Sequence, residues 1–297
     1  MNMFKGSNVA LVTPFKDNQL DEENYIKLIN FHLENGTNGL VPAGTTGESP
    51  TLSHKEHEKV IELCINEAKG KIPVIAGTGS NSTEEAISLT KHAEKAGADG
   101  ALVVTPYYNK PTQEGLYQHY KAINDNCGIP VIIYNIPGRS VIDMTVDTMA
   151  RLFELKNISG VKDATGILDR VDQQKAKMGS EFIQLTGEDG NAFEFNKRGG
   201  IGCISVTANV APKLCSEMQS LSLSGDHKKI AEAENIDKKL QPLHKSLFIE
   251  SNPSPVKYAA KILNLCDDAV RLPLVTVTDS TKEEVKKALK IANLINE

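Results

Sequence analysis

The stretch IPVIIYNIPGRSVIDMTVDTMARLFELKNISGVKDATG, residues 129–166, holds a complete strand–helix–strand unit. Its apolar run at 129–137 predicts a buried strand, the pattern over 145–157 predicts a helix, and 158–165 predicts the next strand. Strands that alternate with helices lie parallel in one sheet. This stretch therefore predicts an α/β fold built on a parallel sheet.

The same unit recurs along the chain. We count eight strand–helix units, with strands expected at 7–15, 38–44, 72–79, 99–108, 129–137, 158–165, 182–189 and 201–209. Eight units is the number that closes a (β/α)8 TIM barrel, and an open doubly wound sheet is the alternative. Residues 1–226 form the expected catalytic barrel, and 227–297 form a C-terminal three-helix extension.

Composition excludes several classes of protein. The 297 residues carry a net charge of −5 without a Lys/Arg block, which argues against nucleic acid or an anionic membrane as partner. No apolar run approaches the ~18 residues of a membrane span, and the N-terminus lacks the features of a signal peptide. The five cysteines are dispersed and lack a CxxC pair, so we expect reduced thiols, no metal and a cytoplasmic location.

Lys162 is the sharpest chemical signal, because it interrupts an apolar strand near its carboxyl end. Strand alternation places it on one face with Gly160 and Ala164, which leave room around it. Burial disfavours the charged form of an amine, and a neutral amine can attack a carbonyl to form a Schiff base. A lysine that reaches solvent or pairs with a carboxylate is the alternative. Tyr134, one strand earlier, could supply the proton transfers of imine formation.

Two further groups of residues draw attention. GTTGES (44–49) lacks the P-loop pattern, and its backbone N–H groups and hydroxyls suit a small carboxylate. Arg139 is a candidate second carboxylate clamp or an exposed loop residue. His54 and His57 lie three residues apart on an expected helix, where a solvated face is favoured over a metal pair.

GTTGES, YYNKP, YNIPGR, GVKDATG and GCISVTAN, in this order, resemble the motifs of the dihydrodipicolinate synthase family (4-hydroxy-tetrahydrodipicolinate synthases). That family belongs to the pyruvate-dependent class I aldolases, which include the N-acetylneuraminate lyases. The resemblance runs from about residue 4 to the C-terminus. It implies a (β/α)8 barrel with a C-terminal helical domain, a homotetramer built as a dimer of dimers, and no cofactor or metal.

The resemblance also implies catalytic roles. Lys162 would form the Schiff base with pyruvate, and Tyr134 would be the general acid/base. Thr45 would connect Tyr134 through a hydroxyl relay to Tyr108, which comes from the neighbouring subunit in this family.

Substrate-binding roles follow in the same way. Thr46 would hold the pyruvate carboxylate, while Gly187 and the Ile204 carbonyl would line the same pocket. Arg139 would receive the carboxylate of L-aspartate 4-semialdehyde. The implied reaction is an aldol-type addition followed by cyclisation, as the first committed step toward diaminopimelate and lysine.

A third set matches positions that bind L-lysine as feedback inhibitor in the inhibitable members: Pro50, His54, His57, Asn81, Glu85 and Tyr107. Pro50 and Cys203 depart from the residues that are commoner in the family at these places. Two other functions remain open at this point: a 2-keto-3-deoxy sugar acid aldolase or lyase, and a catalytically idle lysine-binding regulator.

Overall fold

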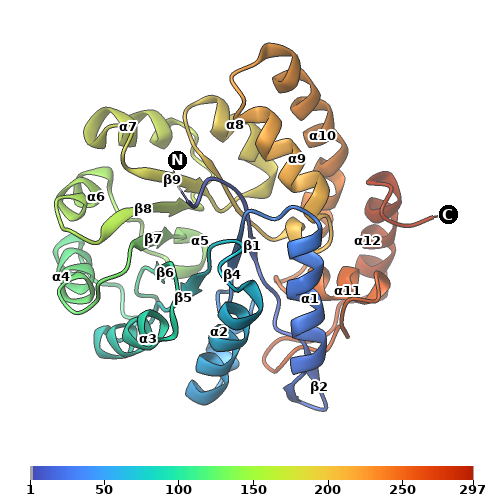
Figure 1. The fold of residues 1–297 in the computed structure, drawn as a ribbon, viewed down its shortest axis with the longest axis horizontal. Coiled ribbons are helices and arrows are strands. Elements are labelled where there is room, and N and C mark those ends of the chain that lie inside the picture. The colour runs from blue at the N-terminus through green and yellow to red at the C-terminus, as the bar shows by residue number, and fades with distance from the viewer. Residues whose placement is uncertain (1–2, 297) are drawn as a thin grey trace.

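The computed structural model describes residues 3–296. Eight parallel strands form the sheet in the order β4-β1-β10-β9-β8-β7-β6-β5, and a parallel bridge between Leu40 and Val74 joins its two ends into a barrel (Figure 1). These strands are β1 Gly6–Ala10, β4 Gly39–Val41, β5 Ile75–Gly77, β6 Gly100–Val104, β7 Val131–Asn135, β8 Ile158–Asp163, β9 Ile183–Thr186 and β10 Gly202–Ser205. The barrel prediction is confirmed, and the open sheet is excluded.

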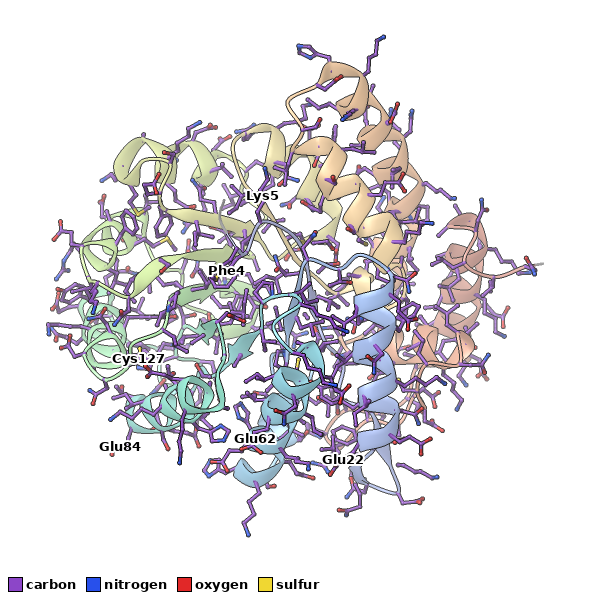
Figure 2. All side chains as sticks on the ribbon, in the orientation of Figure 1. Phe4, Lys5, Glu22, Glu62, Glu84 and Cys127 are labelled. Atoms are coloured by element: carbon purple, nitrogen blue, oxygen red, sulfur yellow. The ribbon has the colours of Figure 1, made fainter. Side chains whose placement is uncertain are left out.

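Helices surround the barrel (Figure 1). They are α1 Glu22–Glu34, α2 His54–Ala68, α3 Thr83–Ala96, α4 Gln113–Asn124, α5 Pro137–Ser140, α6 Val146–Phe153, α7 Asp169–Met178, α8 Ala192–Lys197 and α9 Pro212–Ser222. The strand expected at 7–15 ends earlier than predicted, at Ala10, and a small hairpin of β2 Phe15–Lys16 and β3 Gln19–Leu20 follows it. Acidic side chains such as Glu22, Glu62 and Glu84 extend from α1, α2 and α3 (Figure 2).

The barrel interior is a packed core at its amino end. Phe4 is buried among interior side chains that include Ile75, Ile132 and Ile204. A Cβ on Gly100, at the start of β6, would lie 2.9 Å from the Phe4 ring, so the ring packs against that end of the barrel. This filling is usual in (β/α)8 barrels and leaves the carboxyl ends of the strands to form a site.

Ser53 and Ser82 cap the N-termini of α2 and α3 in different ways. Ser53 forms a full capping box with Glu56 at the start of α2. Ser82 accepts a hydrogen bond from the Glu85 backbone at the start of α3, but the Glu85 carboxylate binds His54 and Ser80 instead of the Ser82 backbone. Residues 82–85 therefore form only the first half of a capping box, because tertiary partners bind the Glu85 carboxylate.

The C-terminal segment forms the three expected helices: α10 His227–Ser246, α11 Ser254–Ile262 and α12 Asp279–Ile291. α10 packs against α9 and α12 at one side of the barrel (Figure 1). Leu243, Val256 and Leu289 from these helices are fully buried in one hydrophobic cluster with Leu28 and Ile61 of the barrel helices. Within residues 3–296, no helix is long and apolar enough to cross a bilayer.

Candidate active site

Tyr134 and Lys162 face each other across neighbouring strands. The register of β7 and β8 pairs Tyr134 with Lys162, and the lysine Nζ lies 4.0 Å from the centroid of the tyrosine ring. Lys162 is 5% exposed, which excludes the alternative of a lysine that reaches solvent. The neighbouring Asp163 pairs with Arg170, and no carboxylate within residues 3–296 lies at ion-pair distance from Lys162 Nζ. The amine is thus held against an aromatic face.

Small residues leave the lysine its space. A Cβ placed on Gly187 would lie 2.8 Å from Lys162 Cε and 2.8 Å from Ala164 Cβ, so the lysine chain passes directly over this glycine. The charge of the Lys162 amine also affects the pKa of the adjacent Glu188. Burial raises the pKa of Glu188, the charge of Asp189 adds to the rise, and the positive charge of Lys162 opposes it.

A cavity of about 220 Å³ opens beside Tyr134, which lines it; Lys162 contacts the ring of Tyr134 and is not itself a lining residue. The cavity lining includes Thr45, from the loop after β4, and Tyr107, from the loop after β6. It also includes Tyr134, at the end of β7, and Arg139 of α5, which follows β7. The cavity therefore brings together a hydroxyl, two phenols and a guanidinium at the carboxyl ends of the strands, where barrel enzymes carry their chemistry.

Thr46, within the turn GTTGES, is buried and contacts a residue that the sequence did not single out. Asn252, between α10 and α11, donates from Nδ2 to Thr46 Oγ1 at 3.0 Å, and its backbone carbonyl accepts from Arg139 Nη2 at 3.4 Å. Because Asn252 is 206 positions away from Thr46, no local pattern could have indicated this contact.

The C-terminal segment also anchors the turn through a buried ion pair. Lys257 of α11 is 0% exposed and pairs with Glu48. The second Glu48 oxygen accepts from the Arg271 backbone N–H at 3.0 Å. On the other side of the turn, Thr13 Oγ1 donates to the Gly47 carbonyl at 2.7 Å. The hydroxyls of Thr45 and Thr46 thus sit on backbone held from two sides.

Asp189 organises the loop after β10, which carries Ile204. Its carboxylate accepts from the backbone N–H of Val206 at 2.8 Å and of Thr207 at 3.1 Å, and also from Ser205 Oγ. Cys203 is buried and lies 3.9 Å from the same carboxylate, measured from Sγ. Asp189 thus holds the loop that follows Ile204.

Tyr108 lies apart from the other expected catalytic residues. It is 88% exposed, has a positive φ of 71° and does not line the cavity. Within residues 3–296, no hydrogen bond joins the Tyr134 hydroxyl to Thr45 or Tyr108. The position of Tyr108 on the surface is compatible with a contribution to the site of a second copy of the chain. The hydroxyl relay stays a prediction.

Two of the six residues of the expected lysine pocket, Pro50 and Tyr107, line the same cavity. His54 Nε2 lies 2.9 Å from Glu85 Oε1, and Asn109 donates to the Asn81 carbonyl at 2.8 Å. Burial and the charge of Glu85 raise the pKa of Tyr107.

The two histidines differ in their surroundings. His54 is exposed, as a solvated helix face requires, but His57 is buried and its Nε2 donates to the Gly77 carbonyl at 2.9 Å. Burial lowers the pKa of His57. The solvated-face interpretation is therefore wrong for His57, because α2 packs this residue against β5.

A (β/α)8 barrel with a buried lysine beside a tyrosine at the carboxyl ends of its strands has the build of barrel lyases that work through an amine. Comparison with known proteins narrows this class. The chain belongs to the dihydrodipicolinate synthetase family, whose model matches residues 3–292. It is therefore an enzyme of the lyase class.

Relatives cover the whole chain. The 4-hydroxy-tetrahydrodipicolinate synthase of Pelagibacter ubique is 76% identical over 99% of this chain and 100% of its own. That of Bradyrhizobium diazoefficiens is 63% identical over 99% and 98%. The dihydrodipicolinate synthase of Acinetobacter baumannii, solved with pyruvate, superposes with a TM-score of 0.95 at 48% identity, covering 98% of this chain and 99% of the other. The DHDPS of Cyanidioschyzon merolae, solved with lysine bound, gives 0.95 at 36% identity, covering 99% of each chain.

Proposed function

We propose that the chain is a 4-hydroxy-tetrahydrodipicolinate synthase, which condenses pyruvate with L-aspartate 4-semialdehyde. The observation that carries this proposal is the buried Lys162 amine, 4.0 Å from the ring centroid of Tyr134, which lines a cavity together with Thr45 and Arg139. The relatives of highest identity described above carry this activity in their names.

The first half of the reaction would take place on Lys162. In its unprotonated form the amine attacks the keto carbon of pyruvate, and loss of water leaves an imine on Nζ. Tyr134 is placed to pass protons to the departing water. Thr46 Oγ1 accepts a hydrogen bond from Asn252, so its own hydrogen is free to donate to the pyruvate carboxylate.

The second half would join the two substrates. The pyruvate imine loses a proton to become an enamine, whose carbon attacks the aldehyde carbon of the semialdehyde. The amino group of the semialdehyde portion then attacks the imine carbon, closes the ring and releases Lys162. Arg139, on the cavity wall, would hold the carboxylate of the semialdehyde with its planar fork.

The shared chemistry is tested by incubating the chain with pyruvate and borohydride and locating the adduct by peptide mass spectrometry. We expect an adduct on Lys162 in the wild-type chain and none in Lys162→Ala. A wild-type chain without an adduct would refute both the synthase and the sugar acid aldolase. Turnover with the semialdehyde, compared with 2-keto-3-deoxy sugar acids, then separates these two.

Arg139 provides the substrate test. Arg139→Gln should raise the KM for the semialdehyde and leave the pyruvate adduct intact, because the guanidinium acts on the second substrate. Arg151→Gln is the matched control, since Arg151 lies on α6 and pairs at the surface with Glu114. Equal KM values for the semialdehyde in wild type and Arg139→Gln would remove Arg139 from the site.

We further propose that the enzyme serves diaminopimelate and lysine biosynthesis and responds to L-lysine. Tyr107, which lines the cavity, and the His54–Glu85 pair, whose carboxylate acts on Tyr107, support a site for an amino acid. The test is the ratio of turnover with and without lysine. Glu85→Gln should bring this ratio toward one if the carboxylate binds the amine of the inhibitor.

Assembly and location complete the proposal. We propose a homotetramer in which Tyr108 completes the site of a neighbouring copy, and its exposure supports this role. Tyr108→Phe should lower turnover without preventing the pyruvate adduct. Sedimentation in the analytical ultracentrifuge should give the mass of four chains. We also propose a cytoplasmic location, which cell fractionation checks.

We propose the boundary between barrel and helical extension at residues 226 and 227, where Asp226 caps α10. Because Leu243 and Leu289 share a buried cluster with the barrel helices, a chain cut after residue 226 should expose apolar surface and aggregate. A soluble, folded fragment 1–226 would contradict this.

A further inference from the structure

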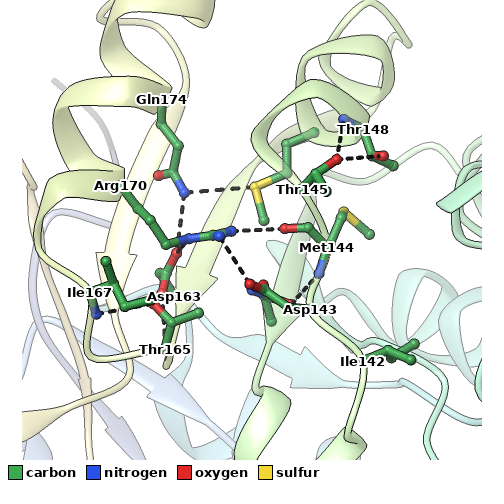
Figure 3. Close-up of polar contacts among 12 residues, drawn as sticks. Ile142, Asp143, Met144, Thr145, Thr148, Asp163, Thr165, Ile167, Arg170 and Gln174 are labelled. Atoms are coloured by element: carbon green, nitrogen blue, oxygen red, sulfur yellow. Dashed lines mark hydrogen bonds and ion pairs between the residues drawn. The ribbon is translucent and has the colours of Figure 1, made fainter.

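A mostly buried polar network, in which Asp143 is exposed, lies behind Tyr134 and Lys162, on the helix side of the sheet (Figure 3). The residues that follow them in sequence, Asn135 and Asp163, pair in the register of β7 and β8. Because successive side chains of a strand point to opposite faces, Asn135 and Asp163 point away from the barrel interior. Both are buried.

Arg170, on the first turn of α7, lies at the centre of this network (Figure 3). Its Nε donates to Asp163 Oδ2 at 2.9 Å, and its Nη2 donates to the Met144 carbonyl at 2.8 Å. Its Nη1 lies 3.2 Å from Asp143 Oδ2. One planar guanidinium thus binds the end of β8 and the loop between α5 and α6.

Asn135 closes the connection to β7. Its Nδ2 donates to Asp143 Oδ1 at 2.7 Å, and its Oδ1 accepts from the Met144 backbone N–H at 3.0 Å. The chain of contacts therefore runs from Asn135 through Asp143 and Met144 to Arg170 and Asp163. It joins the two residues adjacent to Tyr134 and Lys162 by a second route, besides the backbone ladder of the sheet.

The Asp163 carboxylate is fully engaged within this network. Oδ1 accepts from the Thr165 N–H at 2.9 Å and from the Thr165 hydroxyl at 2.6 Å. Oδ2 accepts from Arg170 and from Gln174 Nε2, the latter at 3.2 Å. A carboxylate with four donors has a fixed orientation, so the strand end beside Lys162 is fixed with it.

We propose that Arg170 is a positioning residue that sets the geometry between the Lys162 amine and the Tyr134 ring. This inference rests on the proposed function, in which Tyr134 exchanges protons at the lysine imine. A misplacement of about 1 Å can cost about 100-fold in rate. The guanidinium holds three partners in one plane, which the point charge of a lysine at the same place does not reproduce.

The test compares Arg170→Lys in two backgrounds, wild type and Tyr134→Phe. In the wild-type background we expect kcat to fall by about tenfold or more, approaching the ~100-fold cost of a 1 Å misplacement, with a smaller change in the KM for pyruvate. In the Tyr134→Phe background the same substitution should cost much less, because no hydroxyl remains to be placed. If the two substitutions acted independently, Arg170→Lys would lower kcat by the same factor in both backgrounds, to within about twofold.

Two further variants guard the interpretation. Asp143→Asn replaces Arg170→Lys in the test if that variant does not fold. It perturbs the same network at a side chain that is 44% exposed, and it should also lower kcat. Leu289→Ala, in the buried part of α12, is the stability control and should lower the melting temperature with kcat unchanged.

Several results overturn the inference. One is a wild-type kcat in folded Arg170→Lys or, where that variant does not fold, in Asp143→Asn. Another is an equal fold-loss in kcat for Arg170→Lys in both backgrounds. The borohydride adduct keeps this separate from the proposed function. A wild-type chain without the pyruvate adduct refutes both, whereas an adduct with an unaffected Arg170→Lys refutes the positioning role alone.

Discussion

Gly187→Ala is the substitution for which the structure makes the sharpest prediction. The added Cβ would lie 2.8 Å from both Lys162 Cε and Ala164 Cβ. That is about 0.7 Å inside the ~3.5 Å separation at which two carbon atoms attract each other. The φ of Gly187 is not in the left-handed region, so alanine is compatible with the backbone. The perturbation is therefore steric and falls on the lysine.

The magnitude follows from which atom can move. The Ala164 Cβ belongs to the backbone frame, whereas the end of the Lys162 chain is flexible, so the lysine yields first. Overpacking of this kind costs about 1–3 kcal/mol of the free energy of unfolding. The shift of the amine by several tenths of an ångström approaches the ~1 Å misplacement that costs about 100-fold in rate. We expect a folded variant with a modestly lower melting temperature and a loss of turnover of tens-fold, by the same relation.

The assay measures the rate of borohydride trapping with pyruvate, the turnover with the semialdehyde, and thermal unfolding. Gly190→Ala is the matched control, because it lies in the same loop and its Cβ would meet only Gln241 Oε1 at an ordinary 3.7 Å. Turnover in Gly187→Ala within about twofold of the Gly190→Ala control, the range of independent small effects, would refute the reasoning.

Three predictions concern stability, measured by urea denaturation. Lys257→Met leaves Glu48 buried without its cation and should cost about 3–5 kcal/mol, whereas a cost below about 1 kcal/mol would contradict a buried pair. Burial lowers the pKa of His32 from 6.5 to about 3. Between these values the unfolded chain binds a proton that the folded chain does not, so stability should fall as pH decreases, by up to about 1.4 kcal/mol per pH unit, and His32→Gln should flatten this dependence; an unchanged slope would count against it. Ser53→Ala should cost about 1 kcal/mol through loss of its cap, and Ser82→Ala less, because Ser82 Oγ accepts at a long 3.5 Å; equal costs would contradict this.

Sequence patterns predicted the order of elements because each depends on neighbours within one strand or helix. The apolar runs ending at Tyr134 and near Lys162 became β7 and β8, and the three C-terminal helices formed where expected. Sequence patterns did not predict the contacts of side chains that have both local and distant partners within reach. Glu85 could have completed a local box with Ser82, but it bound His54, which lies 31 residues earlier.

Motifs located the candidate site residues but could not supply the residues that support them. Asn252 and Lys257 reach the turn that holds Thr46 and Glu48 from more than 200 positions away. Residues of that kind carry no periodic or turn signal that distinguishes them from other helix and loop positions.

The amino-acid sequence alone determined the alternation of strands and helices, the barrel it closes, and the strand ends on which the lysine and the tyrosine lie. Only the tertiary structure decided that the amine rests on the aromatic ring, that an arginine network holds the backs of their two strands, and that the C-terminal helices anchor the threonine turn. The physical reason is range: hydrogen bonding and burial within an element follow from adjacent residues, whereas contacts between elements exist only once the chain has closed on itself.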